Sequence, residues 1–201
     1  MAGKSIDIKG TIVQFILIVF SVVLGIYLSE RIEEGKNKKA SEELLSKIKS
    51  EVKDNLIILN EWGPYHQKIA EKLKELSTDE VFIAEFKKDK FIFFERLLTK
   101  GSFMGKSPAN DAWDIAKSHP LIVNIEYDKL FVLSKVYKQQ EVAFKPGMEM
   151  FELFNSKDVN TDKYAKSNLE LMSYRMRELV AREQQLMDYY KDAAAILDIK
   201  K

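Results

Sequence analysis

Hydrophobic and polar positions divide the chain into an apolar N-terminal segment and a longer amphipathic remainder. Residues 11–28 carry no charged side chain, and thirteen of these eighteen positions are Ile, Val, Leu or Phe. This length reaches the lower end of the range that crosses the hydrocarbon core of a bilayer. Transfer of the apolar side chains into lipid outweighs the cost of the few polar residues among them. The pattern therefore predicts a tail over residues 1–10 and a transmembrane helix over residues 11–29.

A cleaved signal peptide is the main alternative for this segment. The apolar core of a signal peptide is normally shorter and ends at small residues that form a cleavage site. Here the run is followed by Tyr27-Leu28-Ser29-Glu30-Arg31, which contains no such site. We therefore expect the segment to remain attached as a membrane anchor.

The polar and small residues of the predicted membrane helix share one face. At about 100° per residue they fall within an arc of about 80°, with a single apolar residue among them. Small residues let two helices approach closely in lipid, and polar side chains form hydrogen bonds between them. The face favours self-association, although one or two small residues also occur by chance in such helices. It consists of Thr11, Gln14, Ile18, Ser21, Gly25 and Ser29.

Basic residues on the two flanks predict the orientation of the anchor. Lys4 and Lys9 precede the apolar run, and a larger number of basic residues follows it. Because the cytoplasmic flank carries the excess of Lys and Arg, we expect a cytoplasmic domain on an anchor in the bacterial inner membrane. Residues 30–40 are highly charged, and they form either a hinge or a solvated continuation of the membrane helix. The basic residues that follow the run are Arg31, Lys36, Lys38, Lys39, Lys47 and Lys49.

Residues 41–201 have the spacing of apolar positions that is typical of a helical bundle, so the predicted fold class is all-α. Ser41 is a predicted N-cap for the first helix of this domain, and Gly63-Pro64 is its predicted end. A second helix is predicted over residues 69–76. The apolar stripe of the first helix consists of Leu45, Ile48, Val52, Leu56, Leu59 and Trp62.

A third helix is predicted from the pattern that follows. The sequence Ser77-Thr78-Asp79-Glu80 forms a candidate capping box, and Gly101 is a natural C-cap. Between them, Phe82, Phe86, Phe93 and Leu97 recur at helical spacing. The run 91–94 would also suit a short strand, but the chain has no second run to pair with it, which favours helix.

Proline and glycine divide the next part of the chain. Two Gly, two Ser and one Pro make residues 101–110 a predicted loop. Pro120 ends the short helix that follows, and Pro146-Gly147 interrupts a longer one. The predicted helices cover residues 111–118, 127–144 and 148–154.

The last helix has the most regular pattern. Ser167 and Glu170 form a predicted capping box at its start. A heptad-like seam then extends to the C-terminus and packs against other helices, either within the domain or between subunits. The seam consists of Leu169, Met172, Met176, Leu179, Glu183, Leu186, Tyr190, Ala194 and Leu197.

Charge and residue types exclude several kinds of chemistry. Lys plus Arg total 32 and Asp plus Glu total 31, so a net charge of +1 gives no general attraction to nucleic acid. The absence of cysteine excludes disulfides, thiolate nucleophiles and cysteine-bound zinc. His66 and His119 lie in no metal-binding motif, and the chain has no phosphate loop or nucleophile elbow. We therefore expect structural or surface roles for both histidines and a protein that is not an enzyme and needs no metal or cofactor.

One stretch combines irregular backbone with mixed hydrogen-bonding groups and an aromatic side chain, which is typical of a ligand or partner loop. The alternative is a plain helix connection in which Trp113 anchors the core. A small-molecule ligand has no further support. The candidate residues are Ser102, Lys106, Ser107, Asn110, Asp111, Trp113 and His119.

The order of three segments resembles a family of small bacterial single-pass membrane proteins defined as a domain of unknown function. The resemblance implies the same architecture, covers most of the chain and supplies no chemistry. Members of that family usually have a longer basic N-terminal tail, which would place the domain outside the cytoplasm, whereas this chain has Lys4 and Lys9 there. The segments are residues 22–28, residues 45–55, and Ala112-Trp113 through Leu121-Ile122, Leu130 and Tyr137.

These patterns predict a non-enzymatic, membrane-anchored helical protein. Its expected partners are membrane lipid and either further copies of itself or another membrane protein, as in an accessory subunit of a membrane assembly. The alternative is an effector that senses a ligand or partner through its soluble domain. In that alternative the clustered membrane helices form a pore lined by Thr11, Gln14, Ser21 and Ser29.

Overall fold

The structure is a computed structural model that describes residues 8–103 and 105–199, with side chains from residue 12 onward. Helix makes up 82% of it and the described residues contain no strand, which confirms the all-α class. Residues 92–94 are helical, so helix was the better prediction there. The elements are α1 (Ile8–Leu76), α2 (Glu80–Lys88), α3 (Ile92–Leu97), α4 (Asp111–Ser118), the 3-10 helix η1 (Pro120–Asn124), α5 (Tyr127–Ala143), α6 (Lys145–Asn155) and α7 (Ala165–Ile196).

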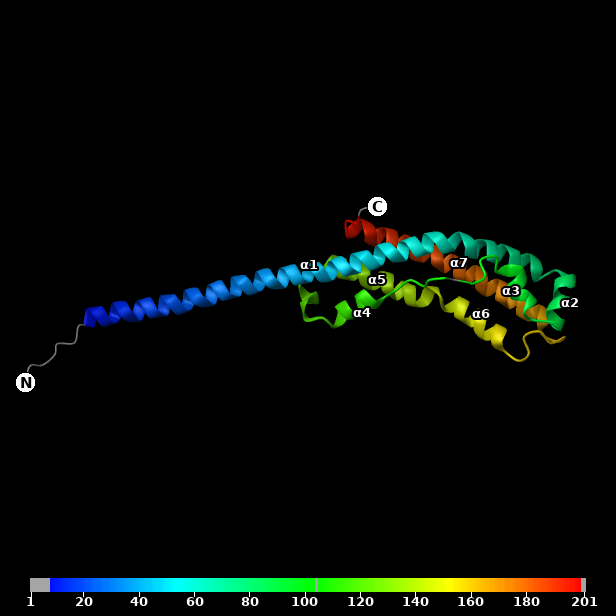
Figure 1. Ribbon diagram of the computed structural model, residues 1–201, viewed down its shortest axis with the longest axis horizontal. Helices are drawn as coiled ribbons and strands as arrows, with labels where there is room; N and C mark the ends of the chain where they lie inside the picture. Colours follow the sequence, from blue (N-terminus) through cyan, green and yellow to red (C-terminus); the bar gives the residue numbers. More distant parts are fainter. Residues whose placement is uncertain (1–7, 104, 200–201) are drawn as a thin grey trace, which may run out of the picture.

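Helix α1 extends far beyond the rest of the fold (Figure 1). Its first half projects as a single helix, and the side chains from residue 12 to residue 36 are all exposed. Its second half is the long edge of a bundle. The projecting half contains the one stretch of the described residues that is long and apolar enough to cross a membrane.

The helix passes without a break through residues 30–40, so the chain has a continuation there and not a hinge. The prediction of a helix start at Ser41 was wrong. The Ser41 hydroxyl donates a hydrogen bond to the Lys38 carbonyl at 2.8 Å, as serine does inside a helix, instead of capping a new one. A cap is needed only where backbone N–H groups lack carbonyl partners, and here the preceding turn supplies them.

The predicted helix end at Gly63-Pro64 was also wrong, because α1 continues to Leu76. A proline inside a helix removes one hydrogen bond and costs about 3 kcal/mol. On both sides of Pro64, however, the same face is buried: Leu59 before it and Leu73 after it are both at most 1% exposed. Packing of this uninterrupted apolar face outweighs the local cost.

The predicted third helix is divided into α2 and α3. Asp79, not Ser77, is the N-cap of α2, and its carboxylate accepts hydrogen bonds from the backbone of Val81 and Phe82. Asp89 ends α2 and forms a turn by accepting from the Phe91 N–H at 2.9 Å. Helix α3 ends at Leu97, so Gly101 is not its C-cap. The glycine instead takes a left-handed conformation, φ 74°, in the turn beyond.

Predictions for the C-terminal half were closer. The bounds of α4 agree with the prediction, and α5 differs by one residue at its end. Helix α6 begins at Lys145, with Pro146 in its first turn, where the missing N–H costs nothing. Helix α7 begins at Ala165, so Ser167 is not its N-cap; its hydroxyl donates to the Tyr164 carbonyl at 3.0 Å.

Helix α7 is the centre of the bundle. It packs against α1 along most of its length, and against α5, α6 and α2 on its other sides. The predicted seam is therefore used within the domain. All its members are buried except Ala194, where the neighbouring Ala193 is buried instead. Figure 1 shows α1 and α7 side by side, with α5 and α6 in succession beneath them.

The central position of α7 gives a direct test of the packing. Leu186 is fully buried between α1 and α5, whereas Leu171 on the same helix is 43% exposed. We expect Leu186→Ala to lower the free energy of unfolding by roughly 2 to 5 kcal/mol, through lost transfer energy and a cavity. Urea unfolding of the detergent-solubilised protein measures this. The matched change Leu171→Ala should cost less than about 1 kcal/mol, and equal losses would contradict the placement of α7.

Candidate functional site

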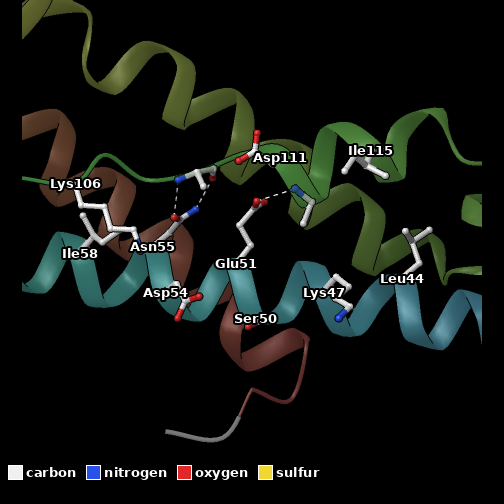
Figure 2. A pocket seen from close by; sticks show the side chains of 12 residues that line it. Leu44, Lys47, Ser50, Glu51, Asp54, Asn55, Ile58, Lys106, Asp111 and Ile115 are labelled. Carbon is white, nitrogen blue, oxygen red and sulfur yellow. Dashed lines mark hydrogen bonds between the residues drawn. The ribbon is translucent and has the colours of Figure 1, made fainter.

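The loop of residues 101–110 and the start of α4 form a groove with α1 (Figure 2). Its volume is about 450 Å³. Leu44 and Ile115 lie at one end and Ile58 and Lys106 at the other. The walls are mainly apolar. The charged lining residues are Lys47, Glu51, Asp54, Lys106 and Asp111.

Glu51 caps helix α4 from another part of the chain. Its carboxylate accepts hydrogen bonds from the backbone N–H of Ala112 at 2.7 Å and of Trp113 at 3.3 Å. No side chain of the local sequence caps this helix. A carboxylate at a helix N-terminus satisfies free N–H groups and interacts favourably with the helix dipole. The position of Glu51 on α1 thus determines where α4 begins.

Tyr137 of α5 completes this arrangement. Its hydroxyl donates to Glu51 at 2.6 Å, and its ring stacks on Trp113 with the centroids 5.4 Å apart. Burial, followed by the hydrogen bond to the negative carboxylate, raises the pKa of Tyr137 well above its usual range. The phenol therefore remains a donor under all ordinary conditions.

Asn55, one turn further along α1, holds the loop backbone. Its side chain both donates to the Ala109 carbonyl at 2.7 Å and accepts from the Ala109 N–H at 2.8 Å. It also donates to the Tyr190 hydroxyl, which in turn donates to Gln140. Gln140 donates to the carbonyls of Pro108 and Ala109. Ala109 is therefore held by side chains of α1 and α5, and the Tyr190 hydroxyl of α7 links these two side chains.

A buried His–Glu pair holds the other end of the loop. Nε2 of His66 donates to the Phe103 carbonyl at 2.9 Å, and because a carbonyl only accepts, this nitrogen carries a proton. Nδ1 lies 2.8 and 2.9 Å from the two carboxylate oxygens of Glu183. Both side chains are at most 3% exposed, so the pair is a structural link between α1, α7 and the loop.

The loop also packs closely on an aromatic ring. A side chain added at Gly105 would place its Cβ 2.8 Å from the Trp62 ring, so only glycine fits without a shift. The Tyr65 hydroxyl donates to the Ser102 carbonyl at 3.1 Å. Asn55, Tyr65 and His66 of α1 are thus all engaged in positioning this connection.

The predicted loop residues are dispersed in the structure. Lys106 and Asp111 reach the groove, whereas Ser107 lines a different hollow beside α6. Asn110 donates to Asp114 at 2.8 Å, and the exposed His119 accepts from the Leu121 N–H at 3.2 Å. Of the remaining two, Trp113 is buried in the core and Ser102 takes part through its backbone.

The predicted association face lies on the projecting half of α1. Its described side chains, at Gln14, Ile18, Ser21 and Ser29, are exposed, and Gly25 has open space around it. The side chain of Thr11 lies outside the described residues. The Ser21 hydroxyl donates to the Leu17 carbonyl of its own helix at 2.7 Å, so this group is already paired.

The residues that sequence reasoning missed are the polar ones on the buried face of α1. The stripe of Ile48, Val52 and Leu59 is interrupted by Glu51 and Asn55, and polar residues within an apolar stripe are a signal for buried hydrogen bonds. Glu183, a charged residue within the apolar seam of α7, indicates a buried hydrogen bond in the same way. Their partners lie up to 135 positions away along the chain, which no spacing pattern reveals.

The comparisons with known proteins give no relative to guide the interpretation. No family model, curated protein or solved structure matches the chain. In the part of the chain that the structure describes, no group of three His, Asp or Glu residues is arranged to hold a metal ion.

The role of Glu51 is testable by its removal. We expect Glu51→Ala to lower the free energy of unfolding by roughly 2 to 3 kcal/mol, because three donors lose a charged acceptor. Glu43→Ala, at an exposed position of the same helix, should change it by less than about 0.5 kcal/mol. Urea unfolding monitored by circular dichroism compares the two variants. Similar losses of stability would rule out the capping of α4 by Glu51.

The burial of Tyr137 and Tyr190 predicts that the folded state loses stability at high pH. Burial raises the pKa of both Tyr137 and Tyr190 in the folded state, above an unfolded value of about 10. The folded state therefore holds these protons more tightly, and this contribution is full below about pH 10 and is lost as the pH rises further. Two of the eight tyrosines should ionise only when helix is lost, measured by tyrosinate absorbance and circular dichroism together. Complete ionisation before unfolding would contradict this.

Proposed function

We propose that the chain is a non-enzymatic, single-pass membrane protein whose helical domain acts through contacts with other proteins, as a self-associating unit or an accessory subunit of a membrane assembly. One observation carries the proposal: α1 is a single helix whose first half is apolar and exposed and whose second half is built into the bundle. An apolar surface of this size is stable in lipid and costly in water. The resemblance to small bacterial single-pass proteins agrees with this architecture.

The continuity of α1 supports a role in positioning. Its 69 residues amount to about 100 Å of helix at 1.5 Å per residue. A domain on such a helix stands at a fixed height and in a fixed rotation relative to the membrane segment. The greater number of basic residues after Ser29 favours the cytoplasmic side for this domain. Rigid presentation of a surface suits a subunit that assembles with others.

The polar groups of the candidate site fit this role. Glu51, Asn55 and His66 are engaged in holding residues 101–110 and α4 in place. A catalytic site needs groups that converge on a space open to substrate. Here the convergent groups bond to one another and to the backbone, which supports a structural use.

Within the membrane, Gly25 and Gln14 are the best candidates for contact between helices. Glycine lowers helix stability by about 0.5 to 1 kcal/mol relative to alanine. Apart from the neighbouring backbone of its own helix, no atom of the described chain comes within 4 Å of a Cβ added at Gly25, so packing within one copy does not explain the glycine. The Ser21 hydroxyl is paired within its own helix, whereas Gln14 provides a side-chain amide on this face that can donate across the interface.

Crosslinking in native membranes tests this proposal. Gly25→Leu should separate the helices, and Gln14→Leu should remove a hydrogen bond worth about 0.6 to 2 kcal/mol. Both should reduce the crosslinked oligomer. Val23→Leu, on the opposite face, also adds bulk and controls for effects on insertion. If all three variants crosslink like the wild type, association does not use this face.

A further inference from the structure

The most exposed apolar side chains of the described chain lie not on the membrane segment but on the bundle. Val123 of η1 is 79% exposed and Tyr127 of α5 is 76% exposed, more than any large hydrophobic residue of the projecting half of α1. Phe131, one turn along α5, is 47% exposed. We call these three residues the apolar tip. A group of exposed apolar side chains is costly in water and is a candidate interaction surface.

The apolar tip contains an exposed aromatic pair. The rings of Tyr127 and Phe131 are stacked with centroids 6.1 Å apart. The ammonium group of Lys135 lies over the Phe131 ring at 4.3 Å, and Lys129 pairs with Glu126 at 2.9 Å. With Asp128 beside them, positive and negative charges around the tip nearly balance. Any partner is therefore held by the apolar and aromatic groups and not by net charge.

The position of the tip indicates its partner. The segment between α4 and α5 forms the end of the bundle nearest the projecting half of α1 (Figure 1). From residue 12 onward, Asn37 is the first residue of α1 that is half-buried and not exposed. Asn37 lies nine positions after Leu28, the end of the apolar run, which is about 13 Å along a helix. The apolar tip thus belongs to the end of the domain closest to the predicted membrane surface.

The length of the predicted membrane segment reduces the gap between the membrane surface and the apolar tip. Residues 11–28 measure about 27 Å as a helix, a few Å less than the hydrocarbon core of about 30 Å, so the lipid boundary lies at or beyond Leu28. The headgroup layer adds about 5 to 8 Å on each side. Membrane helices tilt by about 20° on average, which lowers one side of an attached rigid domain toward the lipid. The remaining gap is within the reach of aromatic side chains.

We infer that the apolar tip inserts into the headgroup region of the same membrane that α1 spans, so that the domain has two points of attachment. This inference rests on the proposed function. Tyrosine suits that layer because its ring is apolar and its hydroxyl is polar. Lysine side chains such as that of Lys135 extend along apolar surface while the charge stays in water. With the second attachment, the bundle lies tilted on the bilayer instead of standing free above it.

The chain contains no cysteine, so single cysteines can be labelled with an environment-sensitive fluorophore. The full-length protein in phosphatidylcholine vesicles would carry the label at Val123→Cys or at Val81→Cys. Val81 is an equally apolar control, 70% exposed, on α2 at the far end of the bundle (Figure 1). A third variant, Leu24→Cys, reports whether α1 lies in lipid at all. The vesicles contain a lipid with a quencher near its headgroup.

We expect quenching at positions 24 and 123, several-fold greater than at position 81. Quenching at 24 with as little at 123 as at 81 would overturn the inference and leave the proposed function standing. An unquenched label at 24 would remove both. A label at 123 that shifts to the blue but is not quenched by lipid would show that a second copy covers the tip, and would overturn the inference.

Discussion

The packing of α1 against α7 is the constraint on which the rest of the structure depends. These two helices share the most extensive contact in the bundle, and α5, α6 and α2 are held by their packing on α7. The same contact keeps α1 helical across Pro64. It also aligns the buried polar residues of the two helices, so that His66 meets Glu183 and Asn55 meets Tyr190. Hydrophobic burial and hydrogen bonding are therefore satisfied by a single arrangement.

Loop 101–110 follows from that arrangement. An irregular segment lacks repeated backbone pairing and needs partners for its N–H and carbonyl groups. Here Asn55, His66 and Gln140 provide them, and Glu51 then positions the start of α4. The groove between α1 and α4 has its shape because three helices determine the path of the loop. A binding partner would meet a preformed surface there, with little ordering cost.

Local pattern was sufficient for the all-α class, the apolar segment, the bounds of α4 and the seam of α7, because each depends on spacing within one element. It failed at Ser41, Pro64 and Ser167, where residues that often mark helix ends lie inside helices. Their signals report local preference, and packing of a continuous apolar face outweighs it. The dispersal of the predicted loop residues and the importance of Glu51 were not predictable from spacing. Both depend on hydrogen bonds between a side chain and a backbone group more than fifty positions apart.

The helix is unbroken between the apolar segment and the bundle, so the length of that connection is significant in itself. At about 3.6 residues per turn, one residue added or removed there would rotate the domain by about 100° about the axis of α1. The face bearing Gly25 and the face packed on α7 are thus held at a fixed angle to each other about the axis of α1. Seven added residues would restore that angle to within about 20° while moving the domain about 10 Å outward. A flexible linker would leave the height and rotation of the bundle relative to the apolar segment free. Here the number of residues in the helix determines both.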